Sequence, residues 1–230
     1  MSDIKICDQT IDDLKEKILA TQVLGIGTGR TVEACLLRLW NDQEIQNHLK
    51  EINCVSSSQR TTLFIQKITQ DKLELVNHNL SDRIDMYLDG ADVINHQGLT
   101  LKGLGGAMVF EKVLAYQAKL FYCVIQPSKF GHFTFDHILP IAVIPSARSS
   151  VARHILTELP ECIMNYRVGS ITDEGCHIID LQGLDFQKPL ALEAFLNNIP
   201  GCVGHGLFAK RIPNGVWLDN GVTTTKMDFH

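Results

Sequence analysis

The sequence lacks the features that mark membrane proteins, disulfide-rich secreted domains and nucleic-acid-binding proteins. It contains no run of about 18 apolar residues, and its first residues form neither the basic nor the apolar region of a signal peptide. The seven cysteines are scattered and form no CxxC pair, so neither a disulfide framework nor a zinc site is expected. A net charge of -5 without any Lys/Arg cluster argues against a nucleic-acid partner.

The residues that are present suit a globular protein. With 230 residues, of which 45% are hydrophobic and 20% charged, the chain can bury one large core or two modest ones. We expect a cytoplasmic protein with no membrane partner. The nine histidines show no HxH or HExxH spacing, so we expect none of them to bind a metal ion.

Strand and helix patterns alternate over the first half of the chain, which predicts a parallel sheet. Three serines, at 56–58, are placed to cap a following helix. We therefore expect an α/β protein with a doubly wound, Rossmann-like sheet. The expected strands are 23–26, 52–55, 73–76, 84–88 and 120–125, and the expected helices are 11–20, 31–40, 59–68 and 107–119.

The second half predicts a smaller domain inserted into the first. A helix over 149–159, a hairpin formed by 166–172 and 176–181, and a helix over 191–198 follow one another as in a β-α-β-β-α-β unit. We expect a small ferredoxin-like α/β domain over residues 131–205. The apolar runs 206–208 and 216–218 are expected to return as strands to the first sheet, so that the catalytic domain comprises residues 1–130 plus 206–230.

Most of the candidate chemistry lies between residues 88 and 112. Asp89 and Asp92 follow a buried strand, and ligands of open α/β sheets bind beyond the carboxyl ends of the strands. Lys102 then opens a glycine-rich turn, and Glu111 lies on the predicted helix that follows. Two carboxylates, an ammonium group and a helix-mounted carboxylate together suit proton transfer on a sugar phosphate.

A first glycine loop, GIGTGRT at 25–31, joins a strand to a helix N-terminus, where free amides and the helix dipole favour an anion. It is not a Walker loop, and the dinucleotide fingerprint is imperfect because Val32 stands where that fingerprint has glycine. A phosphate cradle is one interpretation. A tight turn that simply needs glycine is the other.

Taken together, these segments resemble ribose-5-phosphate isomerase of the A type over nearly the whole chain. The resemblance rests on GIGTGRT at 25–31, VSSS at 55–58, YLDGAD at 87–92, LKGLGGA at 101–107, EK at 111–112, PSK at 127–129, IPSARSSVAR at 144–153 and GLFA at 206–209. It implies an aldose-ketose isomerase of the pentose phosphate pathway that acts on a small phosphorylated sugar without a cofactor or metal. It also implies a homodimer or homotetramer.

The resemblance assigns roles to individual residues of this chain. Glu111 corresponds to the base that transfers the proton, and Lys102, Asp89 and Asp92 surround it as further catalytic residues. The expected substrate-binding residues are Thr28, Gly29, Arg30, Thr31, Ser56, Gly90, Ala91, Gly103, Gly105 and Lys129. The chain departs from the family pattern at four positions, where Arg30 replaces serine, Val93 replaces glutamate, Leu104 interrupts the glycine run and Phe110 replaces arginine. These departures affect substrate placement, because Arg30 adds bulk and charge to a loop that approaches the ligand.

The chemistry is consistent with the resemblance and also leaves alternatives open. Moving a proton between adjacent carbons through an enediol needs one base for both carbons and groups that stabilise the oxyanion. Taken singly, however, Glu111 and Lys112 are typical of a solvated helix face, Lys129 of a surface cation, and Asp89 or Asp92 of a turn. Isomerisation of another phosphosugar and a catalytically silent sugar-phosphate sensor remain alternatives.

Overall fold

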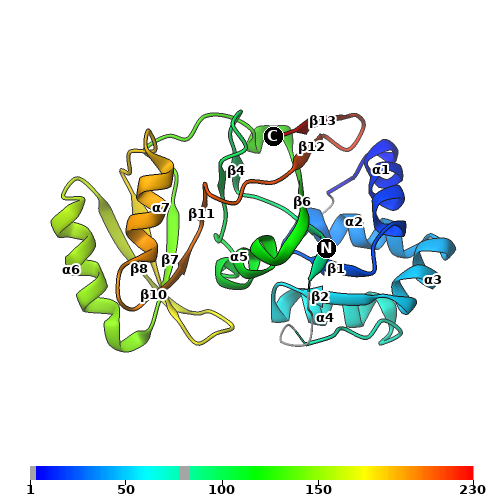
Figure 1. Cartoon of the computed structure of the whole chain (residues 1–230), viewed down its shortest axis with the longest axis horizontal. Helices are drawn as coiled ribbons and strands as arrows, with labels where there is room; N and C mark the ends of the chain where they lie inside the picture. Colours follow the sequence, from blue (N-terminus) through cyan, green and yellow to red (C-terminus); the bar gives the residue numbers. More distant parts are fainter. Residues whose placement is uncertain (1–3, 78–82, 230) are drawn as a thin grey trace. The chain divides into compact units, whose positions relative to one another are not determined.

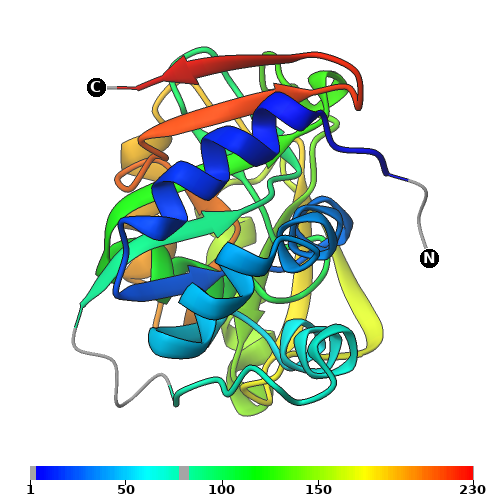
Figure 2. The same cartoon turned by 90° about the vertical axis from the view of Figure 1, so that its right-hand side faces the viewer.

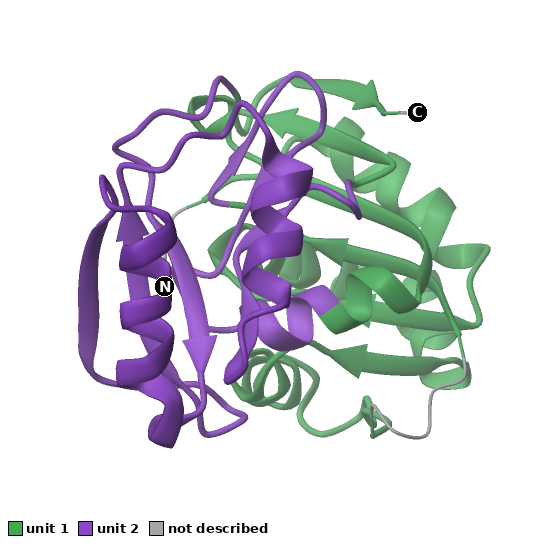
Figure 3. Cartoon of the chain, turned by 60° about the vertical axis from the view of Figure 1, so that its left-hand side comes forward, with its two compact units in different colours: residues 1–91, 113–130, 213–230 green, residues 92–112, 131–212 purple. Residues whose placement is uncertain are grey.

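The computed structural model of the chain describes residues 4–77 and 83–229 and groups them into two compact units (Figure 3). Unit 1 is built from Met1–Ala91, Val113–Phe130 and Pro213–His230, and unit 2 from Asp92–Lys112 and Gly131–Ile212. The segment expected as an inserted domain, 131–205, lies within unit 2. Unit 2 also contains 92–112 and 206–212, which the sequence pattern assigns to the first domain.

Unit 1 is organised around a six-stranded sheet in the order β13-β12-β6-β3-β1-β2 (Figure 1). All neighbouring strands are parallel except β12 and β13, and the strand order reverses between β1 and β3, as in doubly wound sheets. The predicted α/β class is therefore confirmed. The strands are β1 (Val23–Ile26), β2 (Asn53–Ser56), β3 (Ile84–Asp89), β6 (Ala118–Ile125), β12 (Gly215–Asp219) and β13 (Thr224–Asp228).

Two helices of unit 1, α3 and α4, begin after residues whose side chains cap them. The Ser58 hydroxyl accepts a hydrogen bond from Thr61 N at 3.1 Å, which confirms the predicted cap, and the Asp42 carboxylate accepts from Glu44 N at 2.9 Å. Figure 2 shows α1 lying across the strands of the sheet. The helices are α1 (Asp8–Leu19), α2 (Arg30–Trp40), α3 (Gln43–Glu51) and α4 (Gln59–Thr69), while α5 (Met108–Gln117) begins in unit 2 and ends in unit 1.

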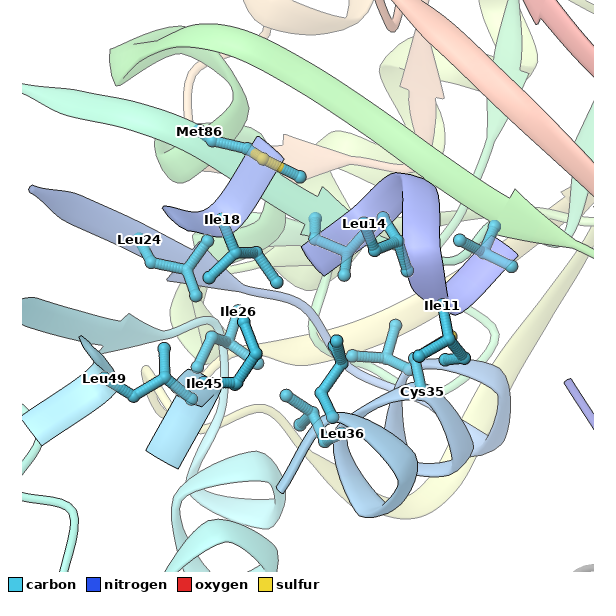
Figure 4. Packing of buried hydrophobic residues seen from close by; sticks show 14 of the residues in the cluster. Ile11, Leu14, Ile18, Leu24, Ile26, Cys35, Leu36, Ile45, Leu49 and Met86 are labelled. Atoms are coloured by element: carbon cyan, nitrogen blue, oxygen red, sulfur yellow. The ribbon is translucent and has the colours of Figure 1, made fainter. Parts of the chain in front are cut away.

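The core of unit 1 follows from the two-residue alternation of its strands. Leu24 and Ile26 of β1 point toward the helices and pack with α1 and α3 residues such as Ile18 and Ile45 (Figure 4). Tyr87 belongs to the opposite face, where its ring stacks on Phe121 with centroids 5.3 Å apart. Each fully buried aliphatic side chain contributes about 1.5–3 kcal/mol to the free energy of folding. Because both faces of the sheet are buried, the strand ends that carry the loops are held in fixed positions.

Unit 2 contains the predicted ferredoxin-like arrangement. Its four-stranded sheet has the order β10-β7-β9-β8 with every neighbouring pair antiparallel, and one helix follows β7 while another follows β9. This is the strand order of a β-α-β-β-α-β unit, so the expectation is confirmed. The elements are β7 (Leu139–Val143), α6 (Arg148–Glu158), β8 (Ile163–Ile171), β9 (His177–Gln182), α7 (Pro189–Asn197) and β10 (Cys202–His205).

A second, three-stranded sheet of unit 2 corrects one prediction. It consists of β11 (Leu207–Phe208), β5 (Thr100–Leu101) and β4 (Val93–Ile94), in that order. The run 206–208 therefore does not return to the large sheet but pairs antiparallel with β5, because so short a run carries no signal that selects its partner. The run 216–218 does return, as part of β12 parallel to β6.

Two further predictions need correction. Residues 73–76 form no extended strand and make only an isolated bridge between Leu75 and Cys54. The helix predicted over 107–119 ends at Gln117, because Ala118 already pairs with Ile84 as the first residue of β6. No helix in the described part of the chain is long and apolar enough to cross a membrane.

Candidate active site

The glycine loop after β1 lies beside the end of β3, where the strand order of the large sheet reverses. Gly27 N donates to Leu88 O at 2.8 Å, so the loop continues the sheet by one residue before it turns toward α2. A Cβ atom at Gly27 would lie 2.0 Å from the Asp89 carboxylate, and Gly29 has a φ of +127°. Both glycines are therefore needed for the path of the chain, which supports the tight-turn interpretation and leaves the phosphate interpretation intact.

Asp89 anchors this loop. Its side chain is fully buried, and Oδ1 accepts from Thr28 N at 3.0 Å and from Gly90 N at 2.7 Å, while Oδ2 accepts from the Tyr87 hydroxyl. Charge-assisted bonds of this kind are about twice as strong as neutral ones. The carboxylate thus ties the loops after β1 and β3 together within unit 1.

A cluster of hydroxyl groups supports the same loop. Thr28 Oγ1 lies 2.8 Å from Ser57 Oγ, 2.7 Å from Ser58 Oγ and 3.1 Å from Thr61 Oγ1. Ser56, the serine expected at the substrate, instead contacts Thr62 Oγ1 at 2.6 Å. The structure therefore adds Ser57 and Ser58 to the surroundings of Thr28, a distinction that three consecutive serines could not reveal.

The remaining candidates of unit 1 lie at the start of α2 and after β6. Arg30 is exposed and Thr31 is buried at the first turn of α2. Glu33, an alternative partner for Arg30, pairs with Arg60 at 2.8 Å. Lys129, in a short 3₁₀ turn (Pro127–Lys129), is half-buried and donates to Ala91 O at 2.7 Å, so it is not a solvated surface cation.

Unit 2 holds the other catalytic candidates, of which Lys102 and Glu111 form a buried pair. Lys102 Nζ lies 3.6 Å from Glu111 Oε2, and the two residues are only 2% and 4% exposed. Lys102 follows β5, where its N–H donates to Gly206 O at 2.9 Å, and Glu111 projects from the first turn of α5. A buried charge is stable only when it is paired or hydrogen-bonded, and this contact contributes to the stabilisation of both groups.

The glycine-rich turn after Lys102 is held from both sides. Leu104 N donates to Asp92 Oδ2 and Leu104 O accepts from Arg167 Nη1, each at 3.0 Å. Gly103 and Gly106 have positive φ angles, +91° and +83°, whereas Leu104 does not. Leucine therefore costs this turn no backbone strain, although it interrupts the glycine run. Arg167 comes from β8, and no sequence signal links it to the turn.

The departure at Val93 also has a structural account. Val93 begins β4, pairs with Leu101 and packs against the apolar core of unit 2, which suits valine better than a carboxylate. A Cβ atom at Gly105 would meet nothing within 4 Å, so that glycine is not required by packing. Among the described residues, no group of three or more His, Cys, Asp or Glu side chains could hold a metal ion.

The structure brings Thr28, Asp89 and Gly90 together in unit 1 and places Asp92, Lys102 and Glu111 on neighbouring segments of unit 2. Ser56 Oγ lies 3.3 Å from Ser58 O and 2.6 Å from Thr62 Oγ1.

Comparison with known proteins identifies the family. The family model described as ribose 5-phosphate isomerase A (phosphoriboisomerase A) matches residues 53–220. The chain is 38% identical over 196 residues to ribose-5-phosphate isomerase A of Legionella pneumophila (strain Lens), covering 84% of this chain and 85% of that protein. It is also 38% identical over 198 residues to the protein of that name from Blochmanniella pennsylvanica (strain BPEN), covering 84% of both chains.

Solved structures agree with this result. The crystal structure of ribose 5 phosphate isomerase A from Neisseria gonorrhoeae is similar with a TM-score of 0.80 at 26% identity, covering 98% of this chain and 99% of that chain. A structure of D-ribose-5-phosphate isomerase in complex with phospho-erythronic acid is similar with a TM-score of 0.81 at 25% identity, covering 98% of this chain and 100% of that one. The protein belongs to the ribose-5-phosphate isomerase A family.

Proposed function

We propose that this chain interconverts ribose 5-phosphate and ribulose 5-phosphate through an enediol, without a metal ion or organic cofactor. The observation that carries the proposal is the buried Lys102–Glu111 pair, 3.6 Å apart, in a chain whose family is ribose-5-phosphate isomerase A. Its relatives of that name, and the similar structure bound to phospho-erythronic acid, support a phosphorylated sugar as substrate.

Glu111 is the proposed general base. Its carboxylate removes the proton from C2 of the open-chain aldose, and the electron pair of that C–H bond forms the C1–C2 double bond of the enediolate. Once the hydroxyl proton on O2 has moved to O1, the C2=O bond forms as the protonated Glu111 returns its proton to C1, which gives the ketose. One base serves both carbons because they are adjacent, and a helix-mounted side chain in an apolar setting holds its position during both transfers.

Lys102 and Asp92 are the proposed partners of this base. The Lys102 ammonium group stabilises the negative charge that develops on the oxygen during enolisation. Asp92 is half-buried and accepts from Leu104 N, so we assign it the transfer of hydroxyl protons during ring opening and enediol formation. Asp89 is fully buried and bonded to Thr28, Gly90 and Tyr87, so we assign it the placement of the glycine loop.

We assign phosphate and hydroxyl recognition to the remaining candidates. Thr28–Thr31 precede or begin α2, whose amide donors and dipole favour an anion, and Arg30 adds a cation there. Lys129 supplies a second cation. Gly90, Ala91, Gly103 and Gly105 offer backbone groups, and Ser56 supports the segment that precedes α4.

We also propose that the protein is cytoplasmic and assembles as a homodimer or homotetramer. Membership of the family supports both statements. Size-exclusion chromatography with light scattering measures the assembly, and a monomer at micromolar concentration contradicts it.

Substrate selectivity tests the proposed function. Turnover of ribose 5-phosphate is compared with that of unphosphorylated ribose and glucose 6-phosphate, with ketose formation as the readout. Loss of two charge-assisted contacts lowers kcat/KM for ribose by about 10² to 10⁴-fold, at about 1.5–3 kcal/mol per contact. Equal kcat/KM values for ribose and its 5-phosphate contradict the phosphate site, and preference for glucose 6-phosphate supports the isomerase of another phosphosugar.

A further inference from the structure

A second buried charge cluster lies directly beside Glu111 in unit 2, and its centre is Lys112. Lys112 Nζ donates to Glu193 Oε1 at 2.9 Å and to Leu207 O at 2.5 Å. It also lies 3.3 Å from His205 Nδ1 and 4.7 Å from the centroid of the Phe208 ring. The side chains of Lys112 and Glu193 are 13% and 3% exposed, so the solvated helix face expected for Lys112 is wrong.

The other members of the cluster have little room to move. Glu193 Oε2 accepts from Ala209 N at 2.9 Å and from Lys210 N at 2.6 Å, and its helix, α7, thereby holds the chain that follows β11. Burial lowers the pKa of Lys112, and it also holds the pKa of His205 well below its usual value. His205 is consequently neutral, and Glu193 is the counter-charge of the ammonium group.

A buried ion pair of this kind is weak evidence for stability, because its desolvation cost offsets its attraction. What it does provide is a fixed geometry between the elements that carry its members. Lys112 fixes α5 against β11 at Leu207 O, and β11 pairs with β5 through Leu207 and Leu101. The residue that follows β5 is Lys102, whose N–H donates to Gly206 O at 2.9 Å.

The ring of Phe208, in β11, lies near both Lys102 and Lys112 and so also links β5 to α5. Lys102 Nζ lies 6.0 Å from its centroid and Lys112 Nζ lies 4.7 Å from it. Gly206 allows the close approach of the two strands, since a Cβ atom there would lie 2.0 Å from Lys102 O. The separation between α5 and β5, and hence between Glu111 and Lys102, is therefore set by the contacts of Lys112.

We propose that Lys112, held by Glu193, is a positioning residue for the reaction: it fixes the base Glu111 against Lys102 through β11 without touching the substrate. This inference rests on the proposed function. It predicts a loss in kcat with little change in KM, because displacement of a reacting group by about 1 Å costs about 10² in rate, whereas phosphate recognition is assigned to other residues.

The test uses the full-length protein and three variants. Lys112→Met keeps the length of the side chain and removes its ammonium group, but it leaves the buried Glu193 carboxylate without a counter-charge. Glu193→Gln removes that carboxylate. The double variant Lys112→Met/Glu193→Gln removes both charges, and its amide oxygen keeps an acceptor for Ala209 N and Lys210 N.

Turnover is measured with ribose 5-phosphate and expressed per folded molecule, with the folded fraction taken from circular dichroism at the assay temperature. We expect the double variant to recover most of the thermal stability that Lys112→Met loses while its kcat stays about 10 to 10²-fold below the wild type and its KM changes little. The matched control is Lys15→Met, which removes a lysine paired with Asp42 at 2.7 Å in unit 1 and should leave kcat and KM unchanged.

Two outcomes overturn the proposal while leaving the proposed function in place. In one, both kcat and the thermal stability of the double variant return to the wild-type values, which shows that the cluster contributes to stability and not to the position of Glu111. In the other, Lys112→Met itself retains wild-type kcat per folded molecule. An inactive wild-type protein, by contrast, contradicts the proposed function and this inference with it, so the two failures are distinguishable.

Discussion

Replacing Glu111 with glutamine changes one carboxylate oxygen to an amide nitrogen and leaves the shape of the side chain intact. The remaining carbonyl oxygen can still face Lys102 Nζ, which lies 3.6 Å from the carboxylate. What the variant loses is the negative charge and the ability to take up a proton. Because a positioned general base contributes about 10² to 10⁴ in rate, we expect kcat to fall by that factor, or by about 2.7–5.4 kcal/mol in activation free energy.

The structure also predicts a cost in stability. Lys102 is 2% exposed, and Glu111→Gln removes the negative charge that lies 3.6 Å from its ammonium group. Removal of one partner of a buried pair costs about 3–5 kcal/mol when nothing replaces it, and the amide oxygen offsets part of this, so we expect a loss of about 1–3 kcal/mol. Denaturant unfolding measures this loss, and a ketose-coupled assay measures kcat and KM.

Glu44→Gln is the matched control. Glu44 also pairs with a lysine, Lys15, at 2.8 Å, but its side chain is 64% exposed. Water replaces the lost contact there, so kcat and the free energy of unfolding should match those of the wild type. Turnover of Glu111→Gln equal to the wild type would remove Glu111 from the mechanism, and equal losses in both variants would show that neutralising any carboxylate is damaging.

Three further predictions concern other parts of the chain. Arg30→Ser should raise KM and flatten its dependence on ionic strength, and equal KM values for both forms at low and high salt would exclude a phosphate role. Burial, reinforced by the Lys112 charge, holds the pKa of His205 well below 6.5, so only the unfolded chain takes up this proton. Stability should therefore fall as pH drops from about 7 to 5, His205→Gln should flatten that slope, and an unchanged slope would contradict the assignment. Burial also raises the pKa of Cys54 to about 12 and of Cys202 to about 11, so Ellman's reagent at pH 8 should label the native protein slowly and all seven thiols after denaturation.

The architecture was predictable because long elements repeat a signal. The strands of the large sheet are apolar runs buried on both faces, and they alternate along the chain with helices that have one apolar face, so this pattern indicates both type and position. The pairing of Leu207–Phe208 was not predictable, because two apolar residues fit the edge of any sheet. The strand predicted over 73–76 is wrong for the same reason. Its apolar pattern is short, and in the structure only Leu75 forms a bridge.

The residue types of the candidate site could be predicted from the sequence, but the separate roles of the individual residues could not. Adjacent carboxylates at a strand end look alike in sequence, yet Asp89 is enclosed by three donors and Asp92 faces a single amide. That difference depends on where the glycine loop returns to the sheet. Lys112 looked like a solvated residue because its partners, Glu193 and His205, lie more than 80 positions away.

The central claim is tested most directly by following ribulose 5-phosphate formation from ribose 5-phosphate with the purified wild-type protein, without added metal and in the presence of EDTA. The account predicts saturable turnover that EDTA leaves unchanged, and the reverse reaction with ribulose 5-phosphate as substrate. A folded protein that binds ribose 5-phosphate but forms no ketose above the blank would contradict the claim and identify a sugar-phosphate sensor. Activity that EDTA abolishes and a divalent ion restores would contradict the metal-independent mechanism.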